Sequence, residues 1–220
     1  MRWAASSPIR ISEAWLTISR NCRILMASPP SYYGEYHIGY AITEELVVNV
    51  VLHICCGVCA AGVMETLAVE GHEIVGYFYN PNIHPQAEYQ RRLDAVWTVA
   101  KRCGFSLEEG PYDPDVWVGE TLLLQGEPEC GQRCGVCFRI RLHKTQLCML
   151  SLGADAFTTT LTVSHHKSAR VVNQIGQDVG AGRFLVRDFK KNDGFKRAMQ
   201  LAKEWDIYRQ NYCGCVYSMR

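Results

Sequence analysis

The chain has 220 residues, of which 48% are hydrophobic and 20% are charged. A chain of this length buries roughly 70% of the surface that it exposes when unfolded, so it can form a hydrophobic core without disulfide staples. The 23 basic and 22 acidic side chains leave a net charge of +1, which excludes a protein that binds nucleic acid through bulk positive charge. No apolar run reaches the roughly 18 residues that a bilayer span requires, so we expect a soluble protein with no membrane partner.

The first 41 residues differ in composition from the rest of the chain. Residues 1–40 contain four arginines, two acids and no lysine, together with many Ser, Pro and Tyr residues. This composition resembles an organellar transit peptide, but it is equally typical of a start codon placed ahead of the true one, for which Met26 is a candidate. We favour a poorly ordered N-terminal extension over residues 1–41, followed by one domain over residues 42–220.

From Leu46 onward, patterns typical of strands and helices alternate. The apolar, β-branched run 46–54 predicts a buried strand of a parallel sheet. Further strands are expected at 73–79, 105–107, 156–160 and 184–186. Helices are expected at 59–70, 87–102, 132–152, 164–174 and 194–206. This alternation predicts an α/β fold of the Rossmann-like type, with a doubly wound, mostly parallel sheet and a helical C-terminal part.

The eleven cysteines are too few for a disulfide scaffold and odd in number, so their positions matter more than their count. Seven of them fall into three short motifs: Cys55-Cys56 with Cys59, Cys134 with Cys137, and Cys213 with Cys215. Such grouping is improbable for inert core residues. The remaining four, which we interpret as bystanders, are Cys22, Cys103, Cys130 and Cys148.

The first motif follows the first predicted strand, where ligands bind in open parallel sheets. A phosphate-binding loop is excluded there, because residues 55–60 contain one glycine and no Lys-Ser/Thr pair. The Cys134/Cys137 pair opens the helix predicted at 132–152, and a helix N-terminus favours the thiolate form.

Two cysteine pairs on separate loops supply four thiolates, the ligand set of tetrahedral zinc or of a [4Fe–4S] cluster. The adjacent residues Cys55 and Cys56 are awkward ligands for a single tetrahedral ion, whereas neighbouring side chains reach two irons of a cluster more easily. We therefore favour the cluster.

The third motif, Cys213-Gly214-Cys215, suits a two-electron redox pair. A disulfide between residues two apart closes a small strained ring, which is easily reduced. The alternative is that both cysteines are further metal ligands, and the glycine between them permits either arrangement.

Six blocks of sequence occur in order over residues 47–217. They are Leu52-His53-Ile54-Cys55-Cys56; residues 79–85 with Glu88-Tyr89; residues 133–142; residues 157–164; Lys167 with residues 188–191; and residues 208–215. Together they resemble the epoxyqueuosine reductase family of the QueH type. The chain departs from the family pattern at Gly57-Val58, where Ala-Pro is usual, and after Ser164, where Ser-Pro is commoner.

The resemblance implies an α/β domain of the HUP type and a cobalamin-independent enzyme. Such an enzyme removes the epoxide oxygen of epoxyqueuosine at the wobble position of tRNA, the last step to queuosine. The resemblance also implies that a [4Fe–4S] cluster is bound by Cys55, Cys56, Cys134 and Cys137. By the same resemblance, Cys213 and Cys215 form the redox-active pair, and the electron donor is unidentified. For Cys59 three roles stay open: a ligand of the cluster, a ligand of an additional iron, or a bystander. A cluster consumes thiols without pairing them and points to a reducing compartment, the cytoplasm.

Polar residues near these motifs are weaker candidates, because each residue type is more often structural. Three histidines are candidates for proton transfer or phosphate binding: His84, His165 and His166. Six basic residues are candidates for contacts with the tRNA backbone: Lys167, Lys190, Lys191, Arg139, Arg141 and Arg209. Three tyrosines are candidates for stacking on an unstacked base: Tyr89, Tyr208 and Tyr212.

Two rival interpretations use the same cysteines. An iron–sulfur reductase of adenylyl-sulfate requires a nucleotide phosphate loop, which residues 55–60 lack. A non-catalytic RNA-binding module stapled by zinc would be colourless when purified without oxygen, whereas a cluster gives broad brown absorbance.

Overall fold

The computed structural model describes residues 48–219. The extension expected over residues 1–41, together with Cys22, lies outside the described residues. No helix within the described part of the chain combines the length and apolar composition of a membrane span.

A four-stranded parallel sheet forms the centre of the described domain, with strand order β3-β2-β1-β4. The strands are β1 (Asn49–His53), β2 (Glu73–Phe78), β3 (Ser106–Glu109) and β4 (Ala156–Thr159). Val51 of β1 pairs with Val75 on one side and with Phe157 on the other. Because β1 is central and covered on both faces, four of its five residues are buried, as its continuous apolar sequence predicts.

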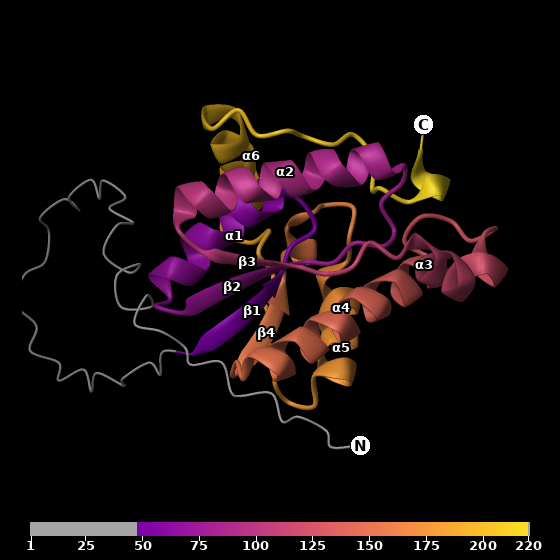
Figure 1. Ribbon diagram of the computed structural model, residues 1–220, viewed down its shortest axis with the longest axis horizontal. Coiled ribbons are helices and arrows are strands. Elements are labelled where there is room, and N and C mark those ends of the chain that lie inside the picture. The colour runs from indigo at the N-terminus through magenta and orange to yellow at the C-terminus, as the bar shows by residue number, and fades with distance from the viewer. Residues whose placement is uncertain (1–47, 220) are drawn as a thin grey trace, which may run out of the picture. The chain divides into compact units, whose positions relative to one another are not determined.

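Helices cover both faces of this sheet. They are α1 (Gly57–Val69), α2 (Gln86–Cys103), α3 (Pro114–Thr121), α4 (Gln132–Leu152), α5 (Ala169–Gly180) and α6 (Gly194–Glu204). Three short 3-10 turns complete the described elements: η3 (Leu122–Leu124), η4 (Thr160–Val163) and η5 (Val216–Ser218). Helices α1, α2 and α6 lie on one face, and α4 and α5 lie on the other (Figure 1). The prediction of a doubly wound α/β fold with a helical C-terminal part is therefore confirmed.

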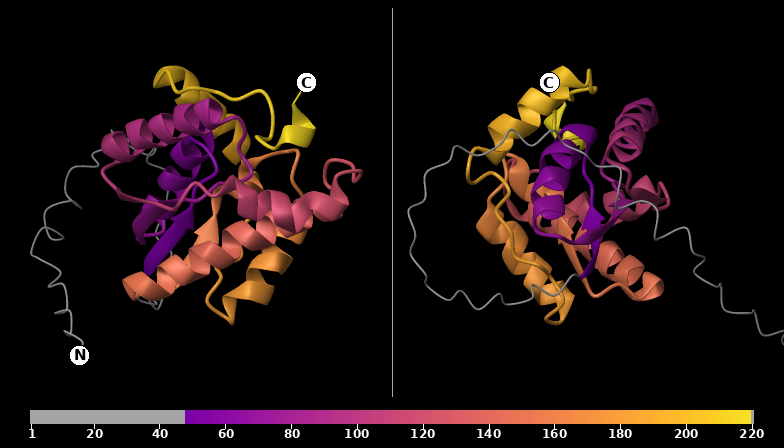
Figure 2. Two further views of the ribbon diagram at one scale, coloured as in Figure 1. Left: turned by 45° about the vertical axis from the view of Figure 1, so that its right-hand side comes forward. Right: turned by 90° about the vertical axis from the view of Figure 1, so that its left-hand side faces the viewer.

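The end of the chain returns to the carboxyl edge of the sheet. Figure 2 shows the C-terminal segment beside α3, where the rings of Trp117 and Tyr217 are 6.0 Å apart. The loops after β1 and β4 leave the sheet at the same edge, because parallel neighbours end together. This edge is where ligands bind in open α/β sheets.

Two predicted elements between Ser164 and Val186 differ from the structure. The helix expected at 164–174 is α5, which begins only at Ala169, because the Ser168 hydroxyl accepts from the Val171 N–H and caps it there. Further upstream, Thr160–Val163 form the buried 3-10 turn η4, which directly follows β4. The strand expected at 184–186 is a single bridge between Phe184 and Phe157.

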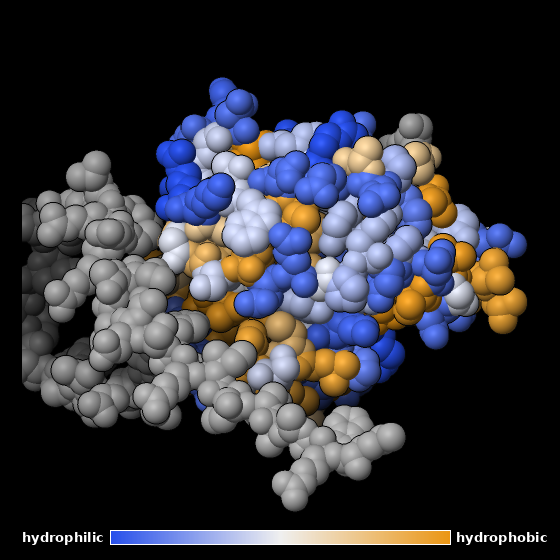
Figure 3. Space-filling model, viewed as in Figure 1, coloured by the Kyte–Doolittle hydropathy of each residue, from blue (hydrophilic) through white to orange (hydrophobic). Residues whose placement is uncertain are grey.

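Helix α3 has no counterpart among the predicted elements. Only Trp117 and Thr121 face inward, while Val116 and Val118 are exposed, so the apolar residues do not form one helical stripe. Apolar side chains also gather on the surface at this end of the molecule (Figure 3), where Leu123 in η3 is 95% exposed. The α3 segment is therefore helical in the structure, although its sequence lacks the amphipathic pattern that predicts a helix.

Candidate functional site

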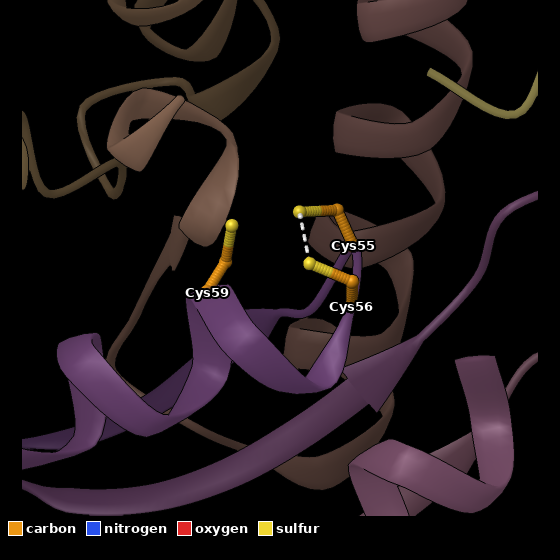
Figure 4. Close-up of side chains that lie close together, drawn as sticks. All are labelled: Cys55, Cys56 and Cys59. Atoms are coloured by element: carbon orange, nitrogen blue, oxygen red, sulfur yellow. Dashed lines mark hydrogen bonds between the residues drawn. The ribbon is translucent and has the colours of Figure 1, made fainter. Parts of the chain in front are cut away.

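The first cysteine motif closes into a compact buried cluster of sulfurs. Cys55 and Cys56 follow β1, and Cys59 lies in the first turn of α1 (Figure 4). The sulfurs of Cys55 and Cys56 are 3.9 Å apart, and all three sulfurs lie within 4.8 Å of one another. Within residues 48–219 this is the only such group of three or more His, Cys, Asp and Glu side chains. The structure thus places Cys59 with the adjacent pair.

Hydrogen bonds concentrate negative charge on Cys55. The neighbouring thiols of Cys56 and Cys59, followed by the positive charges of Lys167 and Arg141, hold the pKa of Cys55 well below its usual range despite burial. Conversely, the hydrogen bond to Cys55 raises the pKa of Cys56 to about 11, and the pKa of Cys59 is raised as well. Thr160 Oγ1 donates to the Cys55 sulfur at 3.2 Å and accepts from the Cys55 N–H at 3.0 Å. Among the three thiols, Cys55 therefore loses its proton most readily.

Arg141 links α4 to the end of the sheet. Its Nη2 donates to Asn80 Oδ1 at 2.6 Å, and its Nη1 lies 4.0 Å from the Cys137 sulfur. Its Nε lies 3.3 Å from His53 Nε2, which also lies 3.2 Å from the Tyr79 carbonyl. Burial, followed by the Arg141 charge, lowers the pKa of His53 to about 3. Arg141, a candidate for the tRNA backbone, is buried beside the thiols and also lines the large cavity described below.

The second cysteine pair lies in the first two turns of α4. The Cys130 N–H donates to the Cys134 sulfur at 3.3 Å, and Cys137 is buried against Trp117 and Cys215. Burial raises the pKa of Cys134 to about 11 and also raises the pKa of Cys137, although Arg141 opposes the latter shift. The prediction that the helix N-terminus favours thiolates here is wrong for the metal-free protein, because burial outweighs the helix dipole.

The third motif connects the other two. Cys213 lines a cavity of about 430 Å³ that also contains Cys55 and Cys59. It lines as well an adjoining cleft of about 20 Å³, together with Cys134, Cys137 and Cys215. Cys213 and Cys215 are thiols in the structure, with no disulfide between them. Of the six predicted site cysteines, all except Cys56 line one of these two spaces, and Cys213 lines both.

The side chains around these two spaces fit a metal ion or metal cluster that is bound by sulfur ligands. Trp117 Nε1 is buried without a hydrogen-bond partner next to Cys137 and Cys215, where sulfur atoms of a bound group would accept a hydrogen bond from it. The argument that Cys55 and Cys56 are awkward for one tetrahedral ion is not supported. Their separation of 3.9 Å is close to the ~3.8 Å expected for two thiolates with metal–sulfur bonds of ~2.3 Å.

The other polar candidates divide between the large cavity and the rest of the domain. The cavity is lined by His166, Lys167, Arg209 and Tyr212. The remaining candidates with described contacts have structural partners. Tyr89 is buried against Phe78, Tyr208 donates to Glu88, and His84 Nδ1 lies 2.9 Å from Asn82 O. His165 packs on Phe195, Lys190 lies 3.5 Å from Asp188, and Arg139 lies 3.2 Å from Asp178.

Three site residues were missed at the level of sequence. Trp117 belongs to the unpredicted helix α3, and Thr160 was treated as part of a strand. Cys130 was taken as a bystander, yet it lines the cleft, and its thiol donates to His166 O at 3.0 Å. The one sequence signal for Cys130 is its position, four residues before Cys134.

The fold and the site define a class: an α/β protein of the HUP type with thiols gathered at the carboxyl edge of a parallel sheet. The solved structure of the U34-tRNA thiolase NcsA from Methanococcus maripaludis, with its [4Fe-4S] cluster, has this fold. It aligns with a TM-score of 0.50 at 13% identity, over 79% of this chain and 62% of the thiolase.

Residues 50–220 match the model of the family described as epoxyqueuosine reductase QueH. Epoxyqueuosine reductase QueH of Streptococcus pyogenes serotype M1 is 39% identical over 186 residues, which cover 80% of this chain and 72% of the relative. Its counterpart in Acinetobacter baylyi is 34% identical over 176 residues, covering 78% and 81%. The chain therefore belongs to the epoxyqueuosine reductase QueH family and is an oxidoreductase, which confirms the resemblance.

Proposed function

We propose that this chain removes the epoxide oxygen of epoxyqueuosine in tRNA to give queuosine. The observation that carries the proposal is the position of Cys213, which lines the large cavity together with Cys55 and Cys59 and the cleft together with Cys134 and Cys137. The names of the relatives support the reaction, and the [4Fe-4S] cluster of the thiolase NcsA supports a cluster on this fold.

The reaction requires two electrons and two protons for each epoxide. Cys213 and Cys215 as a dithiol supply both: the two S–H bonds break, a disulfide forms, the epoxide becomes an alkene, and its oxygen leaves as water. An external reductant of the dithiol class then restores the two thiols. The half-buried Cys213 at the wall of the 430 Å³ cavity is the thiol closer to a bound nucleoside.

Cys55, Cys56, Cys134 and Cys137 would hold the [4Fe–4S] cluster. When bound, the cluster supplies one-electron transfer and a Lewis acid for the epoxide oxygen. Around it, Arg141 and Lys167 place positive charge beside the thiolates, and Trp117 offers an unused N–H. Arg209, Lys167 and His166 line the cavity and supply cationic and polar contacts for a tRNA phosphate.

The close trio of sulfurs supports the second of the three roles left open for Cys59, a ligand of an additional iron. Its sulfur lies within 4.8 Å of the Cys55 and Cys56 sulfurs, so an iron bound by Cys59 would lie beside the cluster that Cys55 and Cys56 hold. A Cys59→Ser variant should then lose about one iron per chain and keep the other four.

The function is tested with protein purified without oxygen. We expect brown protein that contains iron and sulfide and converts epoxyqueuosine tRNA to queuosine tRNA with a dithiol reductant. Cys213→Ser and Cys215→Ser should abolish multiple turnovers, while Cys148→Ser, the matched control distant from the site, should retain them. Colourless zinc protein without this activity would instead identify the RNA-binding module, and reduction of adenylyl-sulfate would identify the other rival.

The proposed partners follow from this chemistry. They are tRNA with epoxyqueuosine at the wobble position and a still unidentified electron donor. Because free thiols and a cluster both require reducing conditions, we place the enzyme in the cytoplasm.

A further inference from the structure

A buried ion pair in α2 has no part in the chemistry described above. Glu88 is 0% exposed and Arg92 is 2% exposed, and Arg92 Nε donates to Glu88 Oε1 at 2.7 Å. Removing two charges from water is costly, and a buried pair stabilises a fold poorly compared with apolar packing. The pair therefore calls for an explanation other than stability.

The remaining nitrogens of Arg92 hold the backbone of the redox motif. Nη1 donates to the Cys213 carbonyl at 3.0 Å, and Nη2 donates to the Tyr212 carbonyl at 3.1 Å. The guanidinium also lies over the Tyr212 ring, 5.1 Å from its centroid. One planar side chain thus uses two nitrogens to join α2 to two consecutive residues of the loop and the third to bind Glu88, which a lysine ammonium cannot reproduce.

The opposite side of the loop is held by the segment before α2. The His84 N–H donates to the Gly214 carbonyl at 2.8 Å, and the Tyr212 hydroxyl donates to the His84 carbonyl. Gly214 has a φ of +115°, and a Cβ there would lie 3.1 Å from Arg92 Nη1 and 3.0 Å from Ile83 Cγ1. Glycine between the two cysteines is therefore required by the positive φ, and the close approach of Ile83 and Arg92 leaves little room for a side chain.

The carboxylate of Glu88 fixes the orientation of Arg92. Its second oxygen accepts from the Tyr208 hydroxyl at 2.8 Å and from Arg91 Nη2 at 2.8 Å, so both oxygens are bound. Arg91 belongs to the same helix, but it is largely exposed and donates to Glu88 alone. The chain of contacts runs from Tyr208 through Glu88 and Arg92 to the Cys213 backbone.

We propose that Glu88 and Arg92 are positioning residues that anchor the Cys213-Gly214-Cys215 loop, so that the Cys213 thiol stays at the junction of the cavity and the cleft. The anchoring itself is independent of the proposed function, whereas its effect on turnover rests on that function. Neither residue touches the reacting atoms; they act through the loop backbone.

The first test measures loop mobility in the reduced holoenzyme. Arg92→Gln and Arg92→Lys should speed amide exchange of His84 and of residues 211–217, and alkylation of Cys213, by about tenfold or more. Tyr208→Phe keeps the ring but frees Glu88, so it should give a smaller increase and serves if the Arg92→Gln variant does not fold. Arg91→Gln should stay within about twofold of the wild type.

The second test measures turnover of epoxyqueuosine tRNA. Arg92→Lys, which keeps a positive charge at the wall of the cavity, should lower kcat about tenfold or more, with KM within about threefold. Arg197→Gln is the structural control: it removes an ion pair to Glu65 at 2.8 and 2.6 Å that joins α6 to α1, away from the loop, and should leave kcat unchanged.

Amide exchange at the wild-type rate in both Arg92 variants would refute the proposal that Arg92 anchors the loop. Faster exchange with an unchanged kcat would refute its role in positioning. If the wild-type enzyme does not act on epoxyqueuosine tRNA, the proposed function fails, and the exchange data still decide whether the loop is anchored.

Discussion

Replacing Thr160 with valine tests the contacts that hold the first cysteine motif. The fully buried hydroxyl accepts from the Cys55 N–H at 3.0 Å and donates to the Cys55 sulfur at 3.2 Å. Valine has the same shape but makes neither bond. The unsatisfied N–H costs about 1–3 kcal/mol and the lost bond to sulfur about 0.5–1.5 kcal/mol. We therefore expect the free energy of unfolding to fall by about 2–4 kcal/mol, and Tm by about 4–15 °C.

The assay is urea unfolding of the reduced, metal-free protein, followed by tryptophan fluorescence. Thr160→Ser keeps the hydroxyl and should lose only about 1 kcal/mol, for the missing methyl group. Thr98→Val on the exposed face of α2, where the hydroxyl donates to Asp94 O at 3.0 Å, should change stability by less than about 0.5 kcal/mol. A valine variant at position 160 within about 0.5 kcal/mol of the wild type would show that the two bonds contribute nothing.

Two further predictions concern packing and thiol reactivity. A Cβ at Gly62 in α1 would lie 2.8 Å from the Ala198 Cβ in α6, so Gly62→Ala should destabilise the protein by about 1–2 kcal/mol in urea unfolding. The control is Gly119→Ala in α3, where a Cβ would meet no atom within 4 Å, so the substitution should be neutral or stabilise the protein by up to about 1 kcal/mol. Equal effects of the two substitutions on stability would contradict the packing of α1 on α6. Burial, followed by the charge of Glu108, raises the pKa of Cys148 to about 11. Cys148 is therefore less ionised at neutral pH than a free thiol, and its alkylation rate should rise with pH up to about 11. At pH 8 we expect alkylation about a hundredfold slower than that of a free thiol, and faster in Glu108→Gln; reaction at the rate of a free thiol would contradict the shift.

Regular elements were predictable where the apolar pattern is periodic and strong. The helix expected at 132–152 coincides with α4, and the strand expected at 73–79 is β2 to within one residue. The failures have separate causes: α3 buries too few side chains to show a helical stripe, and the helix expected at 164–174 begins only at Ala169, where Ser168 caps it.

The sequence by itself determined which cysteines belong together in each motif, because two or three residues of chain are enough to place those sulfurs side by side. Only the tertiary structure decided how the motifs combine. Thr160 reaches Cys55 across 105 residues, and Arg92 reaches Cys213 across 121. Such contacts depend on strand order and helix packing, which no local spacing encodes. The fold likewise decided the direction of the pKa shifts, since burial raises the pKa of Cys134 and Cys137, whereas neighbouring thiols lower the pKa of Cys55 despite burial.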